Sequence, residues 1–284
     1  MKEEDFPSFY QSADELSKRM QSKFYSHFRA HLVLLALATI FSFISPITIF
    51  SSIVQALIFS LVFYCSYILF TERPDQKWYG ARALAESIKT ISWRYMTKAE
   101  PFHQSDCDDF FEKTVKKLIE QNTEIKRKML PKSVPIISDK MREYRNRDFE
   151  TNKLHYKIER IQNQFDWYTQ KAKFNADRSK LFFVLLLLVN AFTVILAISR
   201  IWNLEANFWV TDFFIASSCG ILSWIQAKKY SELSSSYTQT AHDISFSLNT
   251  IDRIKEPEYS HFIGDTENAF SREHTQWLAR KDET

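Results

Sequence analysis

The sequence predicts an all-α membrane protein with four transmembrane helices, arranged as two parallel-repeat hairpins with long cytoplasmic helical extensions. Three observations lead to this prediction. Although 25% of the residues are charged, two long stretches of the chain contain almost no charge. The polar segments beside these stretches repeat apolar residues at the spacing of an α-helix. Only three of the 284 residues are glycine, which disfavours a sheet fold that turns at glycine.

The first hairpin is predicted from the residues between Arg29 and Glu72. These 42 residues include no Lys, Arg, Asp or Glu. Their number corresponds to about two spans of ~20 residues each with a tight connection. Pro46 lies near the middle, where a proline ends the first helix. We therefore expect spans at 27–44 and 51–70, within a first domain of residues 1–102.

The second hairpin is predicted from a shorter uncharged run and the segment that follows it. Residues 181–199 are uncharged, and Arg200 ends this run. After a short turn, residues 208–227 contain one charged side chain, that of Asp212. We expect spans at 181–200 and 208–227, within a second domain of residues 141–284. Residues 103–140 then form a cytoplasmic helix and linker between the two domains.

The distribution of cations predicts the orientation in the membrane. Lys and Arg collect on the cytoplasmic side of membrane proteins, and here only Arg200 lies in a short connection between two spans. Both termini and the middle segment are therefore expected in the cytoplasm. The cations at the opposite ends of the spans are Lys18, Arg19, Lys23, Arg29, Arg73, Lys77, Arg82, Lys171, Lys173, Arg178, Lys180, Lys228 and Lys229.

The polar segment before the third span repeats apolar residues with the heptad spacing of a coiled coil. No Pro or Gly occurs between Pro135 and Gly220, so one helix is predicted from near Met141 through Ser199. The chain thus runs twice through helix, span, turn, span and helix, which predicts a parallel repeat. The residues of the seam are Leu154, Ile158, Ile161, Phe165, Tyr168 and Ala172.

Polar and small residues follow one face of each predicted span. Two interpretations stay open: close packing between helices in lipid, and the lining of a water-filled pore when several copies assemble. One of these residues, Asp212, is also suited to cap the fourth span at the outer interface. The candidates are Ser42, Gln55, Ser66, Asn190, Thr193, Asp212, Ser223 and Gln226.

A row of polar residues follows the second span at helical steps. It is either an exposed face with ion pairs between neighbouring turns or a polar clasp between helices that moves on gating. The row and the two charged residues after it are Arg82, Glu86, Lys89, Trp93, Arg94 and Glu100.

The spacing of glycine, histidine and cysteine excludes dinucleotide and P-loop nucleotide enzymes and disfavours a metal site. Gly80, Gly220 and Gly264 lie far apart, so no phosphate-binding glycine loop can form. Neither the seven histidines nor the three cysteines show the spacing of a metal site. The segment from His103 to Asp109 mixes metal-capable groups, but it also suits an acidic helix start. We expect no enzyme, no catalytic residue, no metal and no cofactor.

Two segments resemble a known family. Residues 83–102, ALAESIKTISWRYMTKAEPF, resemble the signature after the first hairpin of the SLATT family, whose two-transmembrane effectors are associated with SMODS nucleotidyltransferases and SLOG domains in bacteria. Residues 267–277, ENAFSREHTQW, resemble the end of the family's other common domain type. The chain is thus similar to two SLATT domains in tandem. The resemblance adds Glu273, His274 and Trp277 to the architectural or gating candidates.

The resemblance implies an anti-phage or conflict-system effector in the bacterial cytoplasmic (inner) membrane. Such a protein is expected to oligomerise, permeabilise the membrane on activation and kill or arrest the cell. A four-span monomer has little room for a channel, so we expect a homo-oligomer. The chain contains no recognisable nucleotide-sensing domain, which implies a separately encoded trigger or nucleotide-signal partner.

Two other hypotheses stay open. One is a membrane scaffold or sensor that oligomerises and recruits a signalling partner without conducting ions. The other is a lipid enzyme that uses the segment from His103 to Asp109. Nucleic acid is not an expected partner, because 37 Lys and Arg nearly balance 34 Asp and Glu.

Overall fold

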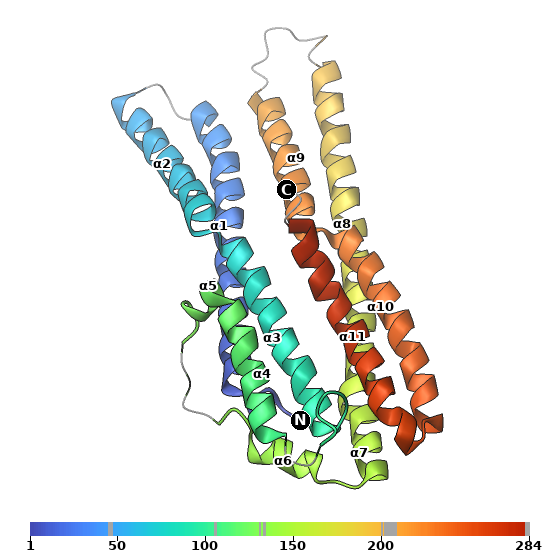
Figure 1. Ribbon diagram of the computed structural model, residues 1–284. Coiled ribbons are helices and arrows are strands. Elements are labelled where there is room, and N and C mark those ends of the chain that lie inside the picture. The colour runs from blue at the N-terminus through green and yellow to red at the C-terminus, as the bar shows by residue number, and fades with distance from the viewer. Residues whose placement is uncertain are drawn as a thin grey trace. The chain divides into compact units, whose positions relative to one another are not determined.

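The computed structural model describes residues 1–44, 48–104, 107–130, 132, 135–199, 201 and 209–281; of residues 43, 44, 209 and 271–281 it gives the backbone alone (Figure 1). Within these ranges the regular structure is helical and contains no strand, which confirms the predicted all-α class. The helices are α1 (Ser8–Ile44), α2 (Ile49–Glu72), α3 (Pro74–Met96), α4 (Asp108–Gln121), α5 (Thr123–Lys126), α6 (Asp139–Arg145), α7 (Phe149–Tyr156), α8 (Asn163–Ser199), α9 (Trp209–Lys228), α10 (Tyr230–Thr250) and α11 (Glu256–Lys281).

Four helical stretches are long and apolar enough to cross a membrane, as the sequence predicts. Each has an 18-residue apolar window of which no more than 6% is buried within the chain. Apolar side chains that are exposed over this length favour a lipid environment, because the exposure of so large an apolar surface to water costs free energy. The stretches are Ser8–Ser42, Ile49–Met96, Phe149–Ser199 and Val210–Arg253.

The chain divides into two compact units, which we call the polar unit and the span unit. The polar unit consists of Met1–Gln21, Asp75–Ala172 and Ser235–Thr284. The span unit consists of Ser22–Pro74 and Lys173–Ser234. Helices α1, α8 and α10 contribute residues to both units.

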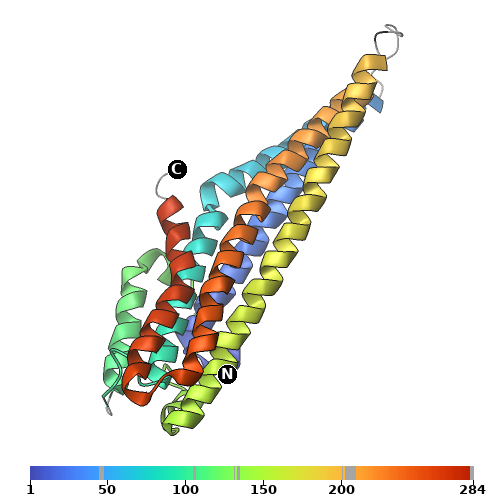
Figure 2. The same cartoon turned by 90° about the vertical axis from the view of Figure 1, so that its right-hand side faces the viewer.

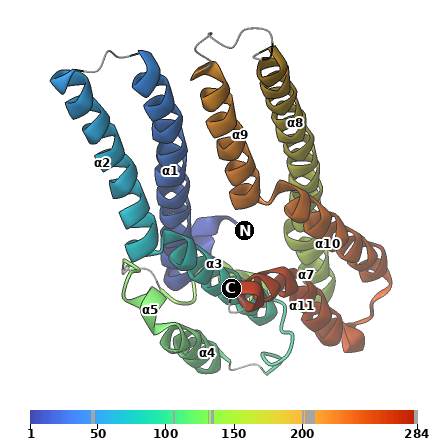
Figure 3. The same ribbon diagram turned by 90° about the horizontal axis from the view of Figure 1, so that it is seen from above.

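In the span unit, α1 lies beside both α2 and α9. Figures 1 and 3 show the order α2, α1, α9, α8. Aromatic rings make the contact between α1 and α9: the ring centroid of Trp224 lies 6.0 Å from that of Tyr25 and 6.3 Å from that of Phe28. Within α8 and α9, Phe192 and Phe214 pack edge to face at 4.7 Å.

The polar unit is built around a buried aromatic core. Its largest fully buried side chains include Trp93, Tyr95, Tyr144, Tyr156 and, unusually, Arg160. Aromatic side chains bury a large apolar area and favour edge-to-face contacts. The core of this unit therefore rests on specific ring contacts from α3, α6 and α7, together with the amino-terminal segment.

The predicted continuous helix from Met141 through Ser199 is wrong at its start. Helix α6 ends at Arg145, and α7 begins at Phe149. Asp148 ends the intervening turn as the N-cap of α7, because its Oδ2 accepts a hydrogen bond of 3.0 Å from the backbone N–H of Thr151. From Phe149 the chain continues as one helical rod into α8 (Figure 2).

The predicted heptad seam is also wrong at its amino-terminal end. Leu154 and Ile158 are each 55% exposed, whereas Asn152, Tyr156 and Arg160 are buried. Residues Lys157–Gln162 form a π-helical segment, which holds more residues per turn than an α-helix and so shifts the buried face. Of the predicted residues, Ile161 within this segment and Tyr168 and Ala172 beyond it are buried.

Candidate functional site

The predicted polar row on α3 contacts α1 inside the polar unit. Arg82 donates to the Oδ1 of Asp14 at 3.2 Å and forms an ion pair of 2.7 Å with Glu86. Lys18 contacts the other carboxylate oxygen of Asp14 at 2.7 Å. The carboxylates of Asp14 and Glu86 belong to buried residues. Arg82 therefore joins two helices, and the row is not an exposed face.

Lys89 lies further along α3, beneath the amino-terminal segment. Its Nζ lies 5.7 Å from the ring centroid of Phe6 and 5.8 Å from that of Tyr10. An ammonium group over an aromatic face is attracted by the negative face of the ring. Lys89 thereby holds the first residues of the chain against α3.

Trp93 is the centre of the aromatic core, with 1% of its surface exposed. Its ring meets those of Phe6, Tyr144 and Tyr156 at centroid distances of 6.1, 5.5 and 5.6 Å, each edge to face. Because these partners come from the amino-terminal segment, α6 and α7, Trp93 joins three parts of the chain.

A buried ion pair lies beside Trp93, and the sequence analysis missed it. Arg160 donates from Nε to the Oε1 of Glu267 at 2.9 Å and from Nη2 to Oε2 at 2.7 Å. The hydroxyl of Tyr156 donates to the same Oε1 at 2.9 Å. The two charged side chains are 1% and 0% exposed. Such two-pronged pairs are the strongest geometry available to arginine and a carboxylate.

Aromatic rings enclose this ion pair on the arginine side. The guanidinium carbon of Arg160 lies 4.7 Å from the ring centroid of Phe270 and 6.0 Å from that of Trp93. A buried Arg within an apolar seam is the signal that sequence could have offered. The sequence could not have shown that the partner of this Arg is a carboxylate 107 residues away along the chain.

Arg94 and Glu100 connect the end of α3 to α11. Arg94 donates to the carbonyl oxygen of Gly264 at 3.1 Å and to the Oδ1 of Asn268 at 2.8 Å. The backbone N–H of Glu100 donates to Ser260 at 2.9 Å, while the Glu100 side chain is exposed. The other predicted gating residues, Glu273, His274 and Trp277, have side chains outside the described residues.

Arg145 is a second buried cation that the sequence did not reveal. It is 5% exposed and donates to the carbonyl oxygens of Tyr95, Phe102 and Gln104. Its guanidinium also lies 4.7 Å from the ring centroid of Tyr95. Arg145 therefore fixes the turn that follows α3 through backbone acceptors, which a sequence pattern cannot show.

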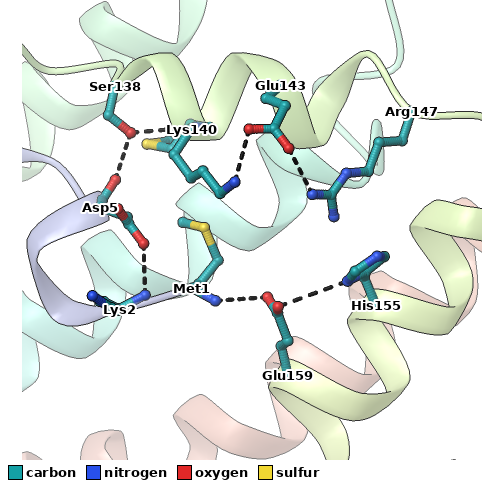
Figure 4. A network of polar contacts seen from close by, with 10 residues as sticks. Met1, Lys2, Asp5, Ser138, Lys140, Glu143, Arg147, His155 and Glu159 are labelled. Atoms are coloured by element: carbon teal, nitrogen blue, oxygen red, sulfur yellow. Dashed lines mark hydrogen bonds and ion pairs between the residues drawn. The ribbon is translucent and has the colours of Figure 1, made fainter.

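A network of polar contacts ties the amino-terminal segment to the N-cap of α6 and to the π-helical segment that follows α7 (Figure 4). The amine of Met1 contacts the Oε2 of Glu159 at 2.7 Å, and the hydroxyl of Ser138 donates to the carbonyl oxygen of Asp5 at 2.6 Å. Glu159 also faces the Nδ1 of His155 at 3.7 Å. These contacts hold Phe6 where it packs on Trp93.

The acidic segment after α3 is occupied by structural contacts. Asp108 accepts a hydrogen bond from the hydroxyl of Tyr95 and forms an ion pair of 3.1 Å with Arg142. Asp109 contacts Lys113 at 2.6 Å. Asp106 lies outside the described residues. Within the described part of the chain, no three His, Cys, Asp or Glu side chains are placed to hold a metal ion.

Three of the predicted span residues lie at contacts between neighbouring helices of the span unit. Ser66 on α2 lies 3.1 Å from the Nδ1 of His31 on α1. The amide of Gln55 donates to the carbonyl oxygen of Ala38 at 3.5 Å. On α8, the Oδ1 of Asn190 accepts a hydrogen bond of 2.6 Å from Ser218 on α9. These residues have the geometry of helix packing.

Among the described residues, the other span candidates form no hydrogen bond to a neighbouring helix. Thr193 donates to the carbonyl oxygen of Val189 on its own helix at 2.8 Å, and Ser223 donates likewise to that of Cys219. Ser42, Asp212, Ser223 and Gln226 are exposed, and Asp212 lies in the first turn of α9. A carboxylate there is favoured by the helix dipole.

Alkaline pH is expected to destabilise the polar unit. Burial raises the pKa of Tyr144 and Tyr259 above the ordinary value of about 10. In the unfolded chain these hydroxyls lose their protons near pH 10, whereas the folded chain keeps them. The folded state then binds more protons, so the free energy of unfolding falls as pH rises above about 10. Thermal unfolding of the detergent-solubilised chain between pH 7 and 11 measures this fall.

Matched variants test the cause of that fall. Tyr144→Phe should make the pH dependence shallower, because it removes one of the buried hydroxyls. Phe110→Tyr adds a tyrosine at a side chain that is 49% exposed and should leave the dependence unchanged. An unfolding midpoint as steep in pH for Tyr144→Phe as for the original chain would contradict this assignment.

Comparison with protein families gives two matches in tandem. Residues 7–153 match the model of SMODS and SLOG-associating 2TM effector domain 3 (SLATT_3), and residues 156–277 match that of SMODS and SLOG-associating 2TM effector domain 1 (SLATT_1). Searches among curated proteins and among solved structures give no match. Trp93 in the first matched segment contacts Tyr156 and Arg160 in the second. The two matched segments therefore share one core in the polar unit.

Proposed function

Because the chain belongs to the SLATT family of two-transmembrane effector domains, which are associated with conflict and defence systems, we propose that it oligomerises and permeabilises the bacterial cytoplasmic membrane on activation. Permeabilisation kills or arrests the cell. In this proposal both termini face the cytoplasm, as the cations at the span ends favour. A separately encoded partner supplies the activating signal.

The observation that supports assembly is the polar face of α9. Cys219, Ser223 and Gln226 follow one another at steps of 4 and 3 and are all exposed within the span unit. Gln226 has no hydrogen-bond partner among the described residues. Polar side chains in a membrane face a protein interior or a water-filled cavity, because hydrocarbon cannot hydrogen-bond to them. A second copy of α9, or water between copies, would satisfy them.

Pore formation follows from the same face when several copies surround one axis. Ser223 and Gln226 then line the cytoplasmic half of the channel, and Asp212 lies near its outer end. In ion channels, rings of polar and acidic side chains take the place of water around a permeating ion. The single chain uses Gln55, Ser66 and Asn190 for its own packing, so α9 is the helix most suited to this role.

The double substitution Ser223→Leu with Gln226→Leu is expected to abolish most of the permeabilisation. An intramembrane hydrogen bond contributes about 0.6–2 kcal/mol. Losing two of them in each copy should reduce assembly, and with it dye release from liposomes that contain the purified chain, by about tenfold. Leu222→Ile changes an exposed apolar residue of the same helix and serves as the control. Undiminished release by the double variant would exclude α9 as the assembly face.

The alternative is a scaffold or sensor that oligomerises and recruits a signalling partner without conducting ions. The intrahairpin bonds of Gln55, Ser66 and Asn190 favour it, since they give these polar residues a packing role. A scaffold predicts intact membrane potential in cells that the protein arrests. It also predicts that arrest survives Gln55→Leu, Asn190→Leu and Gln226→Leu. Depolarisation at the onset of arrest would exclude it.

A further inference from the structure

Two cations of the span unit share one aromatic ring at the boundary between charged and apolar sequence. The Nζ of Lys228, at the end of α9, lies 5.1 Å from the ring centroid of Trp224. The guanidinium carbon of Arg29, on α1, lies 5.8 Å from the same centroid. The Nζ of Lys228 also lies 3.3 Å from the ring centroid of Tyr25. The two positive charges are thus brought together from different hairpins.

Two neighbouring cations, Lys23 and Lys229, have acidic partners, whereas Arg29 and Lys228 have none among the described residues. Lys23 contacts Glu72 at 2.5 Å, and Lys229 contacts Glu232 at 3.8 Å. Within the described ranges, no carboxylate forms an ion pair with Arg29 or Lys228. Two like charges that contact one ring, with no carboxylate paired to either among the described residues, repel each other. The aromatic faces offset part of this repulsion but leave the N–H donors of both side chains available.

The position of the pair indicates the kind of anion that fits. Arg29 directly precedes the uncharged run, and Lys228 directly follows the fourth predicted span. Trp and Tyr side chains concentrate at the depth of lipid headgroups, and Tyr25 and Trp224 flank the two cations here. Basic pockets between transmembrane helices at this depth bind anionic headgroups. The donors therefore lie at the level of lipid phosphates.

We propose that Arg29 and Lys228, held against Trp224, bind the phosphate of an anionic membrane lipid and so join α1 to α9. The guanidinium offers two parallel donors to one phosphate, and the ammonium offers a third. The lipid supplies the negative charge that none of the described residues provides at this contact. This site is independent of the α9 face proposed for the pore.

Native mass spectrometry of the detergent-solubilised chain, titrated with phosphatidylglycerol, tests the proposal. Arg29→Gln combined with Lys228→Gln should weaken retention of the lipid about thirtyfold. Each cation near an anionic headgroup adds to the affinity for the lipid by a similar factor, and this variant removes both cations. The matched control is Lys23→Gln combined with Lys229→Gln, which removes two cations that already have acidic partners and should have little effect. Equal losses in both double variants would reduce the site to general surface charge and overturn the proposal.

Two further arms complete the test. Arg29→Lys combined with Lys228→Arg keeps both charges and should retain the lipid, which separates loss of binding from loss of folding. Inorganic phosphate at constant ionic strength should not displace phosphatidylglycerol, because the acyl chains hold the headgroup at the site. Displacement by inorganic phosphate would assign the site to a soluble anion instead, and unchanged binding in the Gln double variant would exclude it altogether.

Discussion

Replacing Glu267 with alanine is expected to lower the free energy of unfolding of the polar unit by about 3–5 kcal/mol. The substitution leaves the guanidinium of Arg160, which is 1% exposed, without its carboxylate. It also removes the acceptor of the Tyr156 hydroxyl. An uncompensated buried charge is more costly than the loss of the ion pair itself. Thermal unfolding of the chain in detergent should show the loss as a lower midpoint, by about 2–4 °C per kcal/mol.

Two variants separate the buried charge from the mere loss of a glutamate. Arg160→Met combined with Glu267→Met removes both charges and should recover much of the stability, because well-packed apolar residues can replace a buried pair. Glu120→Ala removes an exposed carboxylate that lies 4.0 Å from Lys116, and it should cost less than about 1 kcal/mol. If the double variant were less stable than Glu267→Ala, the explanation by unpaired charge would be wrong.

Replacing Trp93 with alanine is expected to have a comparable effect, again about 3–5 kcal/mol. The substitution opens a cavity between the rings of Phe6, Tyr144 and Tyr156, all of which contact the indole. Three parts of the chain then lose a common partner, so the surrounding core cannot close the cavity by moving one element. The unfolding midpoint in detergent measures the loss.

The control for Trp93 is an aromatic residue of the same unit that does not belong to the core. Phe246 on α10 is 70% exposed, and Phe246→Ala should change stability by no more than about 0.5 kcal/mol. Trp93→Phe keeps an aromatic ring and should lie between the two. A midpoint for Trp93→Ala within a degree of that for Phe246→Ala would show that the indole does not organise the core.

The helical class and the four spans could be predicted because they depend on local composition. A run of uncharged residues such as 30–71 can be recognised without knowledge of its contacts, because its length corresponds to about two crossings of the bilayer. The family resemblance of residues 83–102 and 267–277 is likewise local, and the family matches confirm it. Each of these features can be read within a window of a few tens of residues.

The polar unit could not be predicted in the same way. The periodicity that predicted the seam assumes an α-helix, and the π-helical segment Lys157–Gln162 places Leu154 and Ile158 outside. The break before Phe149 depends on one N-cap, that of Asp148, with no proline or glycine to signal it. The partners of Arg160 and Arg145 lie 41 or more residues away along the chain. The sequence shows the charged residues Arg160 and Arg145, but it does not show which groups accept their hydrogen bonds.

The shared core of the two matched segments has a consequence for how the four spans come together. Two separate hairpin proteins would meet in the membrane at a frequency set by their abundance, and at low abundance many copies would remain apart. Here Trp93, Tyr156 and Arg160 join the segments within one polypeptide, so their effective concentration is fixed by the linkage. The first pairing step is thereby independent of how much protein a cell makes. In the proposed assembly, only the later steps, between whole chains, would depend on the protein concentration.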